Sequence, residues 1–120
     1  MPELPEVETM RRGVLPIVGS RIESAERPAC RLRPILFTPR IDAFNRRIQG
    51  KQVTAIDRRG KRILIELEDR QAIVIEPRMT GLVLVVDPPT HEHLRWRLEL
   101  SGGSVPEICY WDRRGLGNVR

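Results

Sequence analysis

The stretch QVTAIDRRGKRILIELEDRQAIVIE, residues 52–76, decides the fold class of this chain. Residues 52–58, 62–67 and 72–76 within it are rich in β-branched side chains or alternate between apolar and polar positions, as strands do. Only a few residues separate these segments, including the turn-forming pair Glu68-Asp69, and connections this short favour antiparallel hairpins. The stretch therefore predicts consecutive antiparallel strands.

The same pattern continues on both sides of this stretch. Turn-forming pairs divide the sequence that follows it, namely Thr80-Gly81, Pro88-Pro89 and Gly102-Gly103. We expect further short strands at residues 21–27, 35–37, 82–86, 94–100 and 105–111. Trp96 and Trp111 lie in two of these strands, so we expect them to pack on the sheet.

A helix is expected near the N-terminus. Pro5 suits its first position, because the missing N–H costs nothing there. Glu6 and Glu8 then lie in the first turn, at the positive end of the helix dipole. Apolar residues follow at roughly helical spacing and predict one buried stripe, made of Val7, Met10, Val14, Leu15 and Val18.

A second helix is predicted over residues 38–50, TPRIDAFNRRIQG. Thr38 suits the cap, Pro39 the first position and Gly50 the stop. One face would carry Ile41, Phe44 and Ile48. Many short strands with two helices predict an α+β, mainly β fold: an antiparallel β-sandwich, or flattened barrel, with the two helices packed at its edge or end.

The composition fits one globular domain. The chain has 120 residues, of which 40% are hydrophobic, a length suited to a single core. Cys30 and Cys109 lie far apart and form no CxxC pair, so we expect reduced thiols in a cytoplasmic protein and neither a disulfide framework nor a zinc site. The sequence shows no signal-peptide pattern and no run of about 20 apolar residues, so nothing supports secretion or a membrane partner.

The charge points to a nucleic-acid partner. The formal net charge is +5 and the sequence pI is near 10.2. Nearly all of the positive charge is arginine, which makes forked contacts with phosphate groups. A solvated basic face would explain the charge equally well. The basic residues cluster at positions 11–12, 46–47, 58–62 and 113–114.

The opening MPELPEVETM leaves two residues unexplained. Pro2 and Glu3 precede the expected helix, so neither the helix start nor its dipole accounts for them. Taken alone, Pro2 is best explained as a disordered terminus, which is the usual fate of a second residue. Glu3 alone is an ordinary acid near a helix start.

Four stretches, read in order, carry a resemblance. PELPEVE at residues 2–8, RRGKRILIEL at 58–67, PRMTG at 77–81 and DRRGLG at 112–117 resemble the N-terminal domain of the formamidopyrimidine-DNA glycosylase family, the Fpg/MutM and Nei-like bifunctional base-excision enzymes. The opening PELPEVET is the most specific of them, and the resemblance covers essentially the whole chain. It implies the family's sandwich fold and a catalytic N-terminal domain over residues 1–120.

The family continues beyond such a domain. Its members have a helix-two-turn-helix region and usually a four-cysteine zinc finger, and both are absent from these 120 residues. We expect zinc only in that missing C-terminal part, and a monomer as the full-length protein. We also expect the 120-residue chain alone to be inactive or weakly active. If Met1 is retained, the Pro2 nitrogen is an amide and cannot act as a nucleophile.

The resemblance implies a chemistry that explains the N-terminus. After removal of Met1, Pro2 carries a secondary amine that attacks the sugar of a damaged nucleotide and forms a Schiff base. Glu3 transfers protons at the opening sugar, and Lys61, the strand lysine of the family, donates the proton for β-elimination. Neither a metal nor an organic cofactor is needed. The implied activity is that of a DNA glycosylase and AP lyase in base-excision repair, acting on oxidised purines (8-oxoguanine and formamidopyrimidines) or abasic sites in double-stranded DNA, in the cytoplasm at the nucleoid.

Two of these assignments have simpler alternatives. The helix dipole suffices to explain Glu6, although the resemblance implies that Glu6 also supports the site or meets the DNA. Lys61 lies among several basic residues, so it could instead be a phosphate contact or part of a solvated strand edge. Only its position in the family pattern raises it above Arg59 or Arg62.

The resemblance also implies residues that enter the DNA. The damaged base leaves the stack, and side chains on loops fill the gap. Met79, Arg114 and Leu116 correspond to these residues, and His91 and Arg114 to phosphate contacts. Leu116 stands where the bacterial Fpg enzymes usually have phenylalanine. Leucine cannot stack on the orphaned partner base, which puts the opposite-base preference in doubt. Gly115 is a second departure, because it replaces an arginine of the family pattern.

Other functions remain open beside the glycosylase. A catalytically silent DNA-binding or lesion-binding paralogue would fit the departures at Gly115 and Leu116, whereas the intact PELPEVE and Lys61 oppose it. A basic β-rich RNA-binding module would need exposed aromatic residues, and the sequence has few. His91 and His93 without a third ligand make a poor zinc site, so we expect no metal in this chain.

Overall fold

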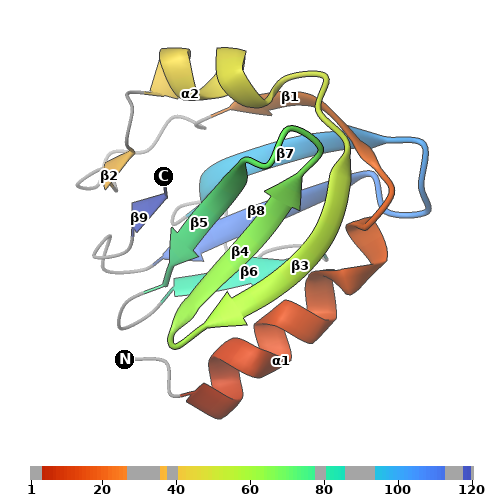
Figure 1. Cartoon of the computed structure of the whole chain (residues 1–120). Helices are drawn as coiled ribbons and strands as arrows, with labels where there is room; N and C mark the ends of the chain where they lie inside the picture. The colour runs from red at the N-terminus through yellow and green to blue at the C-terminus, as the bar shows by residue number, and fades with distance from the viewer. Residues whose placement is uncertain are drawn as a thin grey trace.

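The computed structural model of the chain describes residues 4–26, 36–37, 41–77, 81–85, 94–112 and 118–119. The described strands form two sheets that face each other (Figure 1), in the orders β1-β7-β8-β6 and β2-β9-β5-β4-β3. Neighbouring strands are antiparallel, except that β2 and β9 run parallel. The bounds are Arg21–Glu26 (β1), Leu36–Phe37 (β2), Val53–Arg59 (β3), Arg62–Leu67 (β4), Ala72–Glu76 (β5), Gly81–Leu84 (β6), Leu94–Ser101 (β7), Glu107–Asp112 (β8) and Asn118–Val119 (β9).

The two sheets are joined at one corner. Backbone N–H groups of Gly19 and Val53 donate to the carbonyls of Val53 and Ser20, each at 2.8 Å, where the chain enters β1 and β3. The N–H of Ile22 donates to the carbonyl of Lys51 at 2.8 Å. These bonds connect the starts of the edge strands β1 and β3, so the two sheets are joined at this corner. The expected sandwich or flattened barrel with two helices is confirmed.

The core lies between the sheets and follows the alternation seen in the sequence. Ile63 and Ile65 on β4 face the same way as Ile73 and Ile75 on β5, and all four are buried. The opposite sheet contributes Trp96, which is fully buried and meets the ring of Phe44 edge-on at 5.9 Å between centroids. Trp96 therefore packs in the core, as its place in a strand predicts.

Helix α1, Leu4–Val14, covers the side where β3 and β6 form the edges of the two sheets (Figure 1). Its buried stripe contains Val7, Met10 and Val14, as predicted. The prediction that Leu15 and Val18 continue this stripe is wrong: they are 40% and 42% exposed.

Leu15 and Val18 are exposed because the α-helix ends at Val14. Pro16 lacks the N–H that an α-helix would require, and the chain tightens into a 3₁₀ turn, Leu15–Ile17 (η1). The tighter turn changes which side chain faces inward. Ile17 is buried in place of Leu15 and Val18.

Helix α2, Ile41–Ile48, packs against β1 on the other side of the sandwich (Figure 1). Phe44 and Ile48 are buried, as predicted. Gly50 has φ +83°, a left-handed conformation that suits glycine and ends the helix. The predicted cap Thr38 and first residue Pro39 lie outside the described residues.

Several strand boundaries differ slightly from the prediction. The strands expected at residues 62–67 and 72–76 are found with those bounds, whereas the strand expected at 105–111 is Glu107–Asp112. Pro106 has no N–H to give to a neighbouring strand, which accounts for the later start. Among the described helices, none combines the length and the apolar character that a membrane span needs.

The start of β6 depends on a glycine. A Cβ atom at Gly81 would lie 2.5 Å from the Tyr110 hydroxyl oxygen and 2.7 Å from the Pro77 Cα, closer than real Cβ atoms come. We expect Gly81→Ala to lower the free energy of unfolding by about 1–3 kcal/mol through overpacking. Urea denaturation of the purified protein measures the difference.

Gly13→Ala provides the matched control. Nothing lies within 4 Å of a Cβ atom at Gly13, and alanine in a helix is favoured over glycine by roughly 0.5–1 kcal/mol. This variant should therefore be at least as stable as the wild type. Equal stability of Gly81→Ala and wild type would contradict the close approach at β6.

Candidate functional site

One end of the sandwich collects the beginnings and ends of many elements. Gly81, the first residue of β6, pairs with Asp112, the last of β8. Leu94, the first of β7, pairs with Trp111 on β8. On the other sheet, Arg62 at the start of β4 forms an ion pair with Glu76 at the end of β5, at 3.1 Å.

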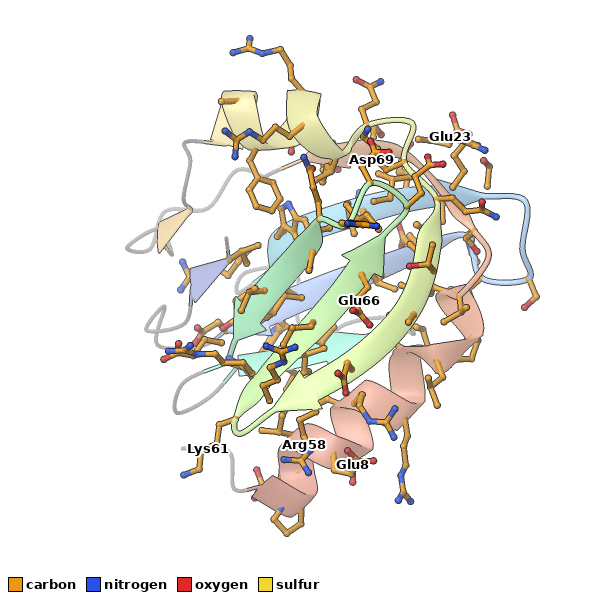
Figure 2. The ribbon with its side chains drawn as sticks, viewed as in Figure 1. Glu8, Glu23, Arg58, Lys61, Glu66 and Asp69 are labelled. Atoms are coloured by element: carbon orange, nitrogen blue, oxygen red, sulfur yellow. The ribbon has the colours of Figure 1, made fainter. Side chains whose placement is uncertain are left out.

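Helix α1 begins at this same end. Glu8 in its second turn receives a hydrogen bond from Arg58 Nε on β3 at 3.0 Å. Figure 2 shows Glu8, Arg58 and Lys61 together at the lower end of the molecule, whereas Asp69 and Glu23 lie at the opposite end. The start of α1, the β3–β4 turn and the start of β6 therefore meet at one end of the sandwich.

Most of the candidate residues lie outside the described residues. This applies to Pro2, Glu3, Met79, His91, Arg114 and Leu116, and also to Gly115. Their roles stay predictions. Each lies within four residues of a described residue at this end: Leu4, Gly81, Leu94 or Asp112.

Lys61 is described, and it lies in a turn. Gly60 and Lys61 form the connection between β3 and β4, in agreement with the strands expected at residues 52–58 and 62–67, whereas the family resemblance had implied a strand lysine. Gly60 has φ +60°, the left-handed conformation that a two-residue hairpin turn needs and that glycine adopts without strain. Lys61 is half-buried at the tip of the hairpin. The turn places its side chain at the end where α1 begins (Figure 2).

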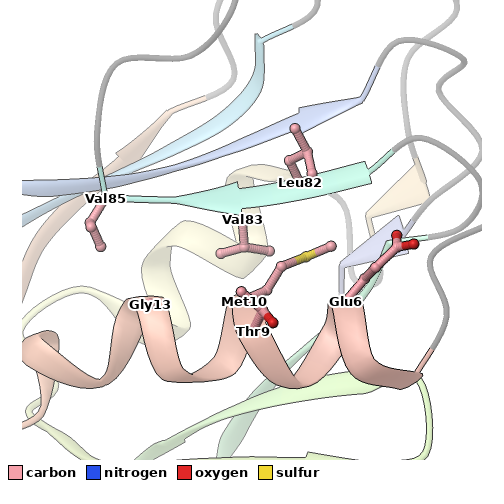
Figure 3. Close-up of a pocket in the computed structure, with 7 residues that line it drawn as sticks. All are labelled: Glu6, Thr9, Met10, Gly13, Leu82, Val83 and Val85. Carbon is pink, nitrogen blue, oxygen red and sulfur yellow. The ribbon is translucent and has the colours of Figure 1, made fainter.

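Glu6 lies in the first turn of α1 and is exposed. Its side chain lines a groove of about 440 Å³ between α1 and β6. Figure 3 shows Glu6 at one end of this groove beside Leu82, with Gly13 and Val85 toward the other end. The other lining residues are Thr9, Met10 and Val83, so Glu6 is the one charged residue among those named as lining the groove.

Glu8 is surrounded by three arginines. Arg11 donates through Nε and Nη2 to its two carboxylate oxygens at 2.9 and 2.7 Å, and Arg12 Nε donates at 2.9 Å. Arg58 Nε supplies the fourth contact, at 3.0 Å. The hydrogen bonds from Arg11 and Arg12 hold the pKa of the Glu8 carboxyl well below its usual range, and Glu8 in turn raises the pKa of Arg11.

This network was not predicted from the sequence, because only an interaction with the helix dipole was expected for Glu8. The spacing of Arg11 and Arg12, three and four residues after Glu8, is a usable signal for ion pairs along a helix. The contact with Arg58 crosses 50 positions of sequence. It depends on the packing of α1 against β3, which local spacing does not reveal.

A buried polar cluster lies where β8 ends. The Tyr110 hydroxyl donates to Asp112 Oδ2 at 2.8 Å, and Arg95 Nε donates to the Asp112 backbone carbonyl at 2.8 Å. All three residues are at most 2% exposed. Burial, followed by the nearby Asp112 charge, raises the pKa of the Tyr110 hydroxyl, which therefore stays a neutral donor. The cluster fixes Asp112, which is the last residue of β8 and the first residue of the DRRGLG motif.

The described residues contain no candidate metal-binding site. Among the described parts of the chain, no group of three or more His, Cys, Asp or Glu side chains could hold a metal ion. His91, His93 and Cys30 lie outside those parts, and Cys109 is buried in β8.

Comparison with known proteins gives consistent matches over the whole chain. The family model for the formamidopyrimidine-DNA glycosylase N-terminal domain matches residues 1–119. Formamidopyrimidine-DNA glycosylase of Chloroflexus aurantiacus is 36% identical over 122 residues, which cover 99% of this chain and 42% of that protein. The chain thus spans less than half the length of such a relative.

Solved structures agree with the sequence comparison. A complex of Lactococcus lactis FPG (MutM) with FAPY-dG-containing DNA has a TM-score of 0.78 and 30% identity, covering 98% of this chain and 43% of that one. A complex of Lactococcus lactis Fpg with DNA containing an abasic site has the same TM-score and identity, covering 98% and 42%. This likeness covers both sheets and both helices.

The lowered pKa of Glu8 gives a pH-dependent contribution to stability. A carboxyl whose pKa is lower in the folded state stabilises the fold above its unfolded pKa, about 4.3 for glutamate, and loses this contribution as the pH falls toward the folded value. Wild type should therefore be more stable than Glu8→Gln at pH 7, and the difference should shrink below about pH 4. Urea denaturation of both proteins across this range measures it, and a difference that does not depend on pH would contradict the network.

Proposed function

This chain belongs to the formamidopyrimidine-DNA glycosylase family through its N-terminal domain, and on that premise we propose that it is the catalytic domain of a bifunctional DNA glycosylase and AP lyase. Its substrates would be oxidised purines, 8-oxoguanine and formamidopyrimidines, and abasic sites in duplex DNA. One observation carries the proposal. The start of α1, the Lys61 turn, the starts of β6 and β7 and the end of β8 share one end of the sandwich. Met79, His91 and Arg114 lie within three residues of these elements in the sequence.

The proposed nucleophile is the Pro2 amine after removal of Met1. An α-amino group has a pKa near 8, so a fraction is unprotonated at neutral pH. The start of α1 lies two residues away, and its positive dipole end favours the uncharged amine. The nitrogen lone pair forms a bond to sugar C1′ while the glycosidic bond breaks, and the departing base keeps the electron pair and gains a proton. The attached Pro2 nitrogen releases its N–H proton to water, which balances this uptake.

The sugar ring then opens to an iminium ion between Pro2 and C1′. Glu3 would protonate the ring oxygen as the C1′–O4′ bond breaks. A water molecule takes up a C2′ proton, and the 3′ phosphate leaves with the electron pair of its C3′–O bond, which breaks the strand. Lys61 would donate a proton to the leaving phosphate oxygen in this elimination. Water hydrolyses the remaining iminium and returns Pro2 as a free amine.

Supporting roles fall to residues around this end. Glu6 would support the site or meet the DNA, and its exposure in the first turn of α1 is compatible with either role. Met79, Arg114 and Leu116 would fill the gap left by the extrahelical base, and His91 and Arg114 would contact phosphates. The excess of arginine favours the DNA backbone as partner.

The amine chemistry uses no metal and no organic cofactor. We expect zinc only in the four-cysteine finger of the family, outside residues 1–120. We further propose a cytoplasmic, nucleoid-associated protein that is monomeric as the complete polypeptide.

A silent DNA-binding or lesion-binding paralogue is the second candidate. Gly115 and Leu116 favour it, because they depart from the residues usual in the bacterial enzymes. Leucine can wedge between bases, but it cannot stack on the orphaned partner base as an aromatic ring does. Lys61 and the PELPEVE motif oppose this reading.

Borohydride trapping on a duplex with one abasic site tests the proposed function. Reduction of the iminium leaves a covalent protein–DNA adduct that is visible on a denaturing gel. We expect an adduct with the complete natural polypeptide that contains residues 1–120, and little or none with a sample that keeps Met1, because the Pro2 nitrogen is then an amide. Mass spectrometry of the intact protein confirms the state of Met1.

Lys51→Met is the matched control for general lysine reactivity, since Lys51 pairs with Asp69 at the opposite end of the sandwich. This variant should trap as the wild type does. Trapping that persists when Met1 is retained would contradict Pro2 as nucleophile. Absence of any adduct from the complete polypeptide would favour the silent paralogue.

A further inference from the structure

Arg58 connects three parts of the candidate site. Its Nε donates to Glu8 Oε1 on α1 at 3.0 Å, and its Nη1 donates to the carbonyl oxygen of Gly60 at 3.0 Å. Lys61 follows Gly60 directly in the β3–β4 turn. Figure 2 shows Glu8, Arg58 and Lys61 at the same end of the sandwich.

The carbonyl that Arg58 holds belongs to the peptide group joining Gly60 to Lys61. A peptide group is planar, so fixing its oxygen also orients the backbone nitrogen of Lys61. Gly60 has φ +60°. Glycine populates many backbone conformations, so the conformation of this turn would vary if no contact restrained it. The guanidinium group is a rigid planar fork, which suits it to hold two acceptors in a fixed relation.

We propose that Glu8 and Arg58 are positioning residues that hold the Lys61 turn against the first turns of α1, and so set Lys61 relative to the N-terminal amine. We call the two side chains the Glu8–Arg58 clasp. The inference rests on the proposed function, in which Pro2 and Lys61 act on the same sugar. Neither clasp residue is assigned contact with the reacting atoms.

The electrostatics keep the clasp closed at working pH. The pKa of Glu8 is held far below neutrality by Arg11 and Arg12, so the carboxylate that faces Arg58 stays charged. Arg11 and Arg12 also fix the orientation of that carboxylate from its own helix, at i+3 and i+4. Arg11 and Arg12 therefore preorganise the Glu8 carboxylate as the acceptor for Arg58.

The lowered pKa of Glu8 comes mainly from Arg11 and Arg12, so stability is a weak explanation for the contact between Glu8 and Arg58. The side chains of Glu8 and Arg58 are 25% and 32% exposed, and ion pairs near the surface contribute little to folding. The chain contains a comparable pair elsewhere: Arg97 Nη1 and Glu26 Oε1, on β7 and β1, at 2.9 Å. That pair also connects two elements, but it touches none of the candidate residues, so it serves as the matched control.

A phosphate contact is the competing role for Arg58. Two of its nitrogens are engaged within the protein, by Glu8 and by Gly60, which favours an internal function. The two roles predict different defects. Loss of a phosphate contact weakens DNA binding and lowers its salt dependence, whereas loss of the clasp misplaces Lys61 on DNA that is already bound.

Single-turnover kinetics on an abasic duplex, with protein in saturating excess, separates these possibilities. Two rates are measured for the complete polypeptide: formation of the borohydride-trapped adduct and strand cleavage. We expect Arg58→Met and Glu8→Gln to slow cleavage about ten- to hundredfold relative to adduct formation, since small misplacements of a reacting group cost this much. Lys61→Met should show the same selective loss, and adding Arg58→Met to it should cause little further loss.

The controls and the contrary outcomes are distinct. Arg97→Met and Glu26→Gln should leave both rates unchanged, and urea denaturation checks that every variant is folded. Normal cleavage by Arg58→Met, equal slowing of both steps, a defect confined to DNA affinity, or additive losses with Lys61→Met would each overturn the clasp. Normal cleavage by Lys61→Met would overturn the role of Lys61 and the clasp with it, while leaving Pro2 intact. A wild-type protein that forms no adduct would overturn the proposed function itself, and this inference with it.

Discussion

Burial of one face of α1 between the edge strands β3 and β6 is the constraint on which the rest of the structure depends. Val7 and Val14 are fully buried and Met10 nearly so, and each such side chain contributes roughly 1.5–3 kcal/mol when taken out of water. The helix thereby covers the side where both sheets end, and its direction is fixed. Its first turn must lie at the end where β6 begins and where the β3–β4 turn lies (Figures 1 and 2).

Antiparallel topology then divides the connections between two ends of the sandwich. The end with the start of α1 carries the Lys61 turn, the start of β6 and the end of β8, which lead to every motif of the family resemblance. The opposite end carries the β4–β5 turn with Asp69, which pairs with Lys51. The two lysines of the chain are therefore separated by the length of the sandwich, and only Lys61 is near the start of α1. Buried Arg95, Tyr110 and Asp112 fix the last residue of β8 at the first end.

Local patterns in the sequence predicted most of the helices and strands, but few of the contacts between them. Alternation identified β4 and β5 with their bounds, because one face of each is buried. The last apolar residues of the first helix were misplaced, because Pro16 changes the helical period after Val14. The family resemblance implied a strand lysine at Lys61, whereas the strand bounds expected from the sequence already left Lys61 in the connection beside Gly60. The contact of Arg58 with Glu8 depends on tertiary packing across 50 positions, and no local pattern contains it. Pro2, Glu3 and the DNA-filling residues were reached through the family resemblance, and they stay predictions.

The most direct measurement identifies the amine that is captured by abasic DNA. Besides the N-terminal nitrogen, this sequence offers two side-chain amines, Lys51 and Lys61. Digestion of the borohydride-reduced adduct, followed by tandem mass spectrometry, locates the attached sugar on one peptide. Attachment to the Pro2 nitrogen is the expected result, because Pro2 precedes the start of α1 by two residues and α1 begins at the same end of the sandwich as the Lys61 turn. Attachment to a lysine would contradict it.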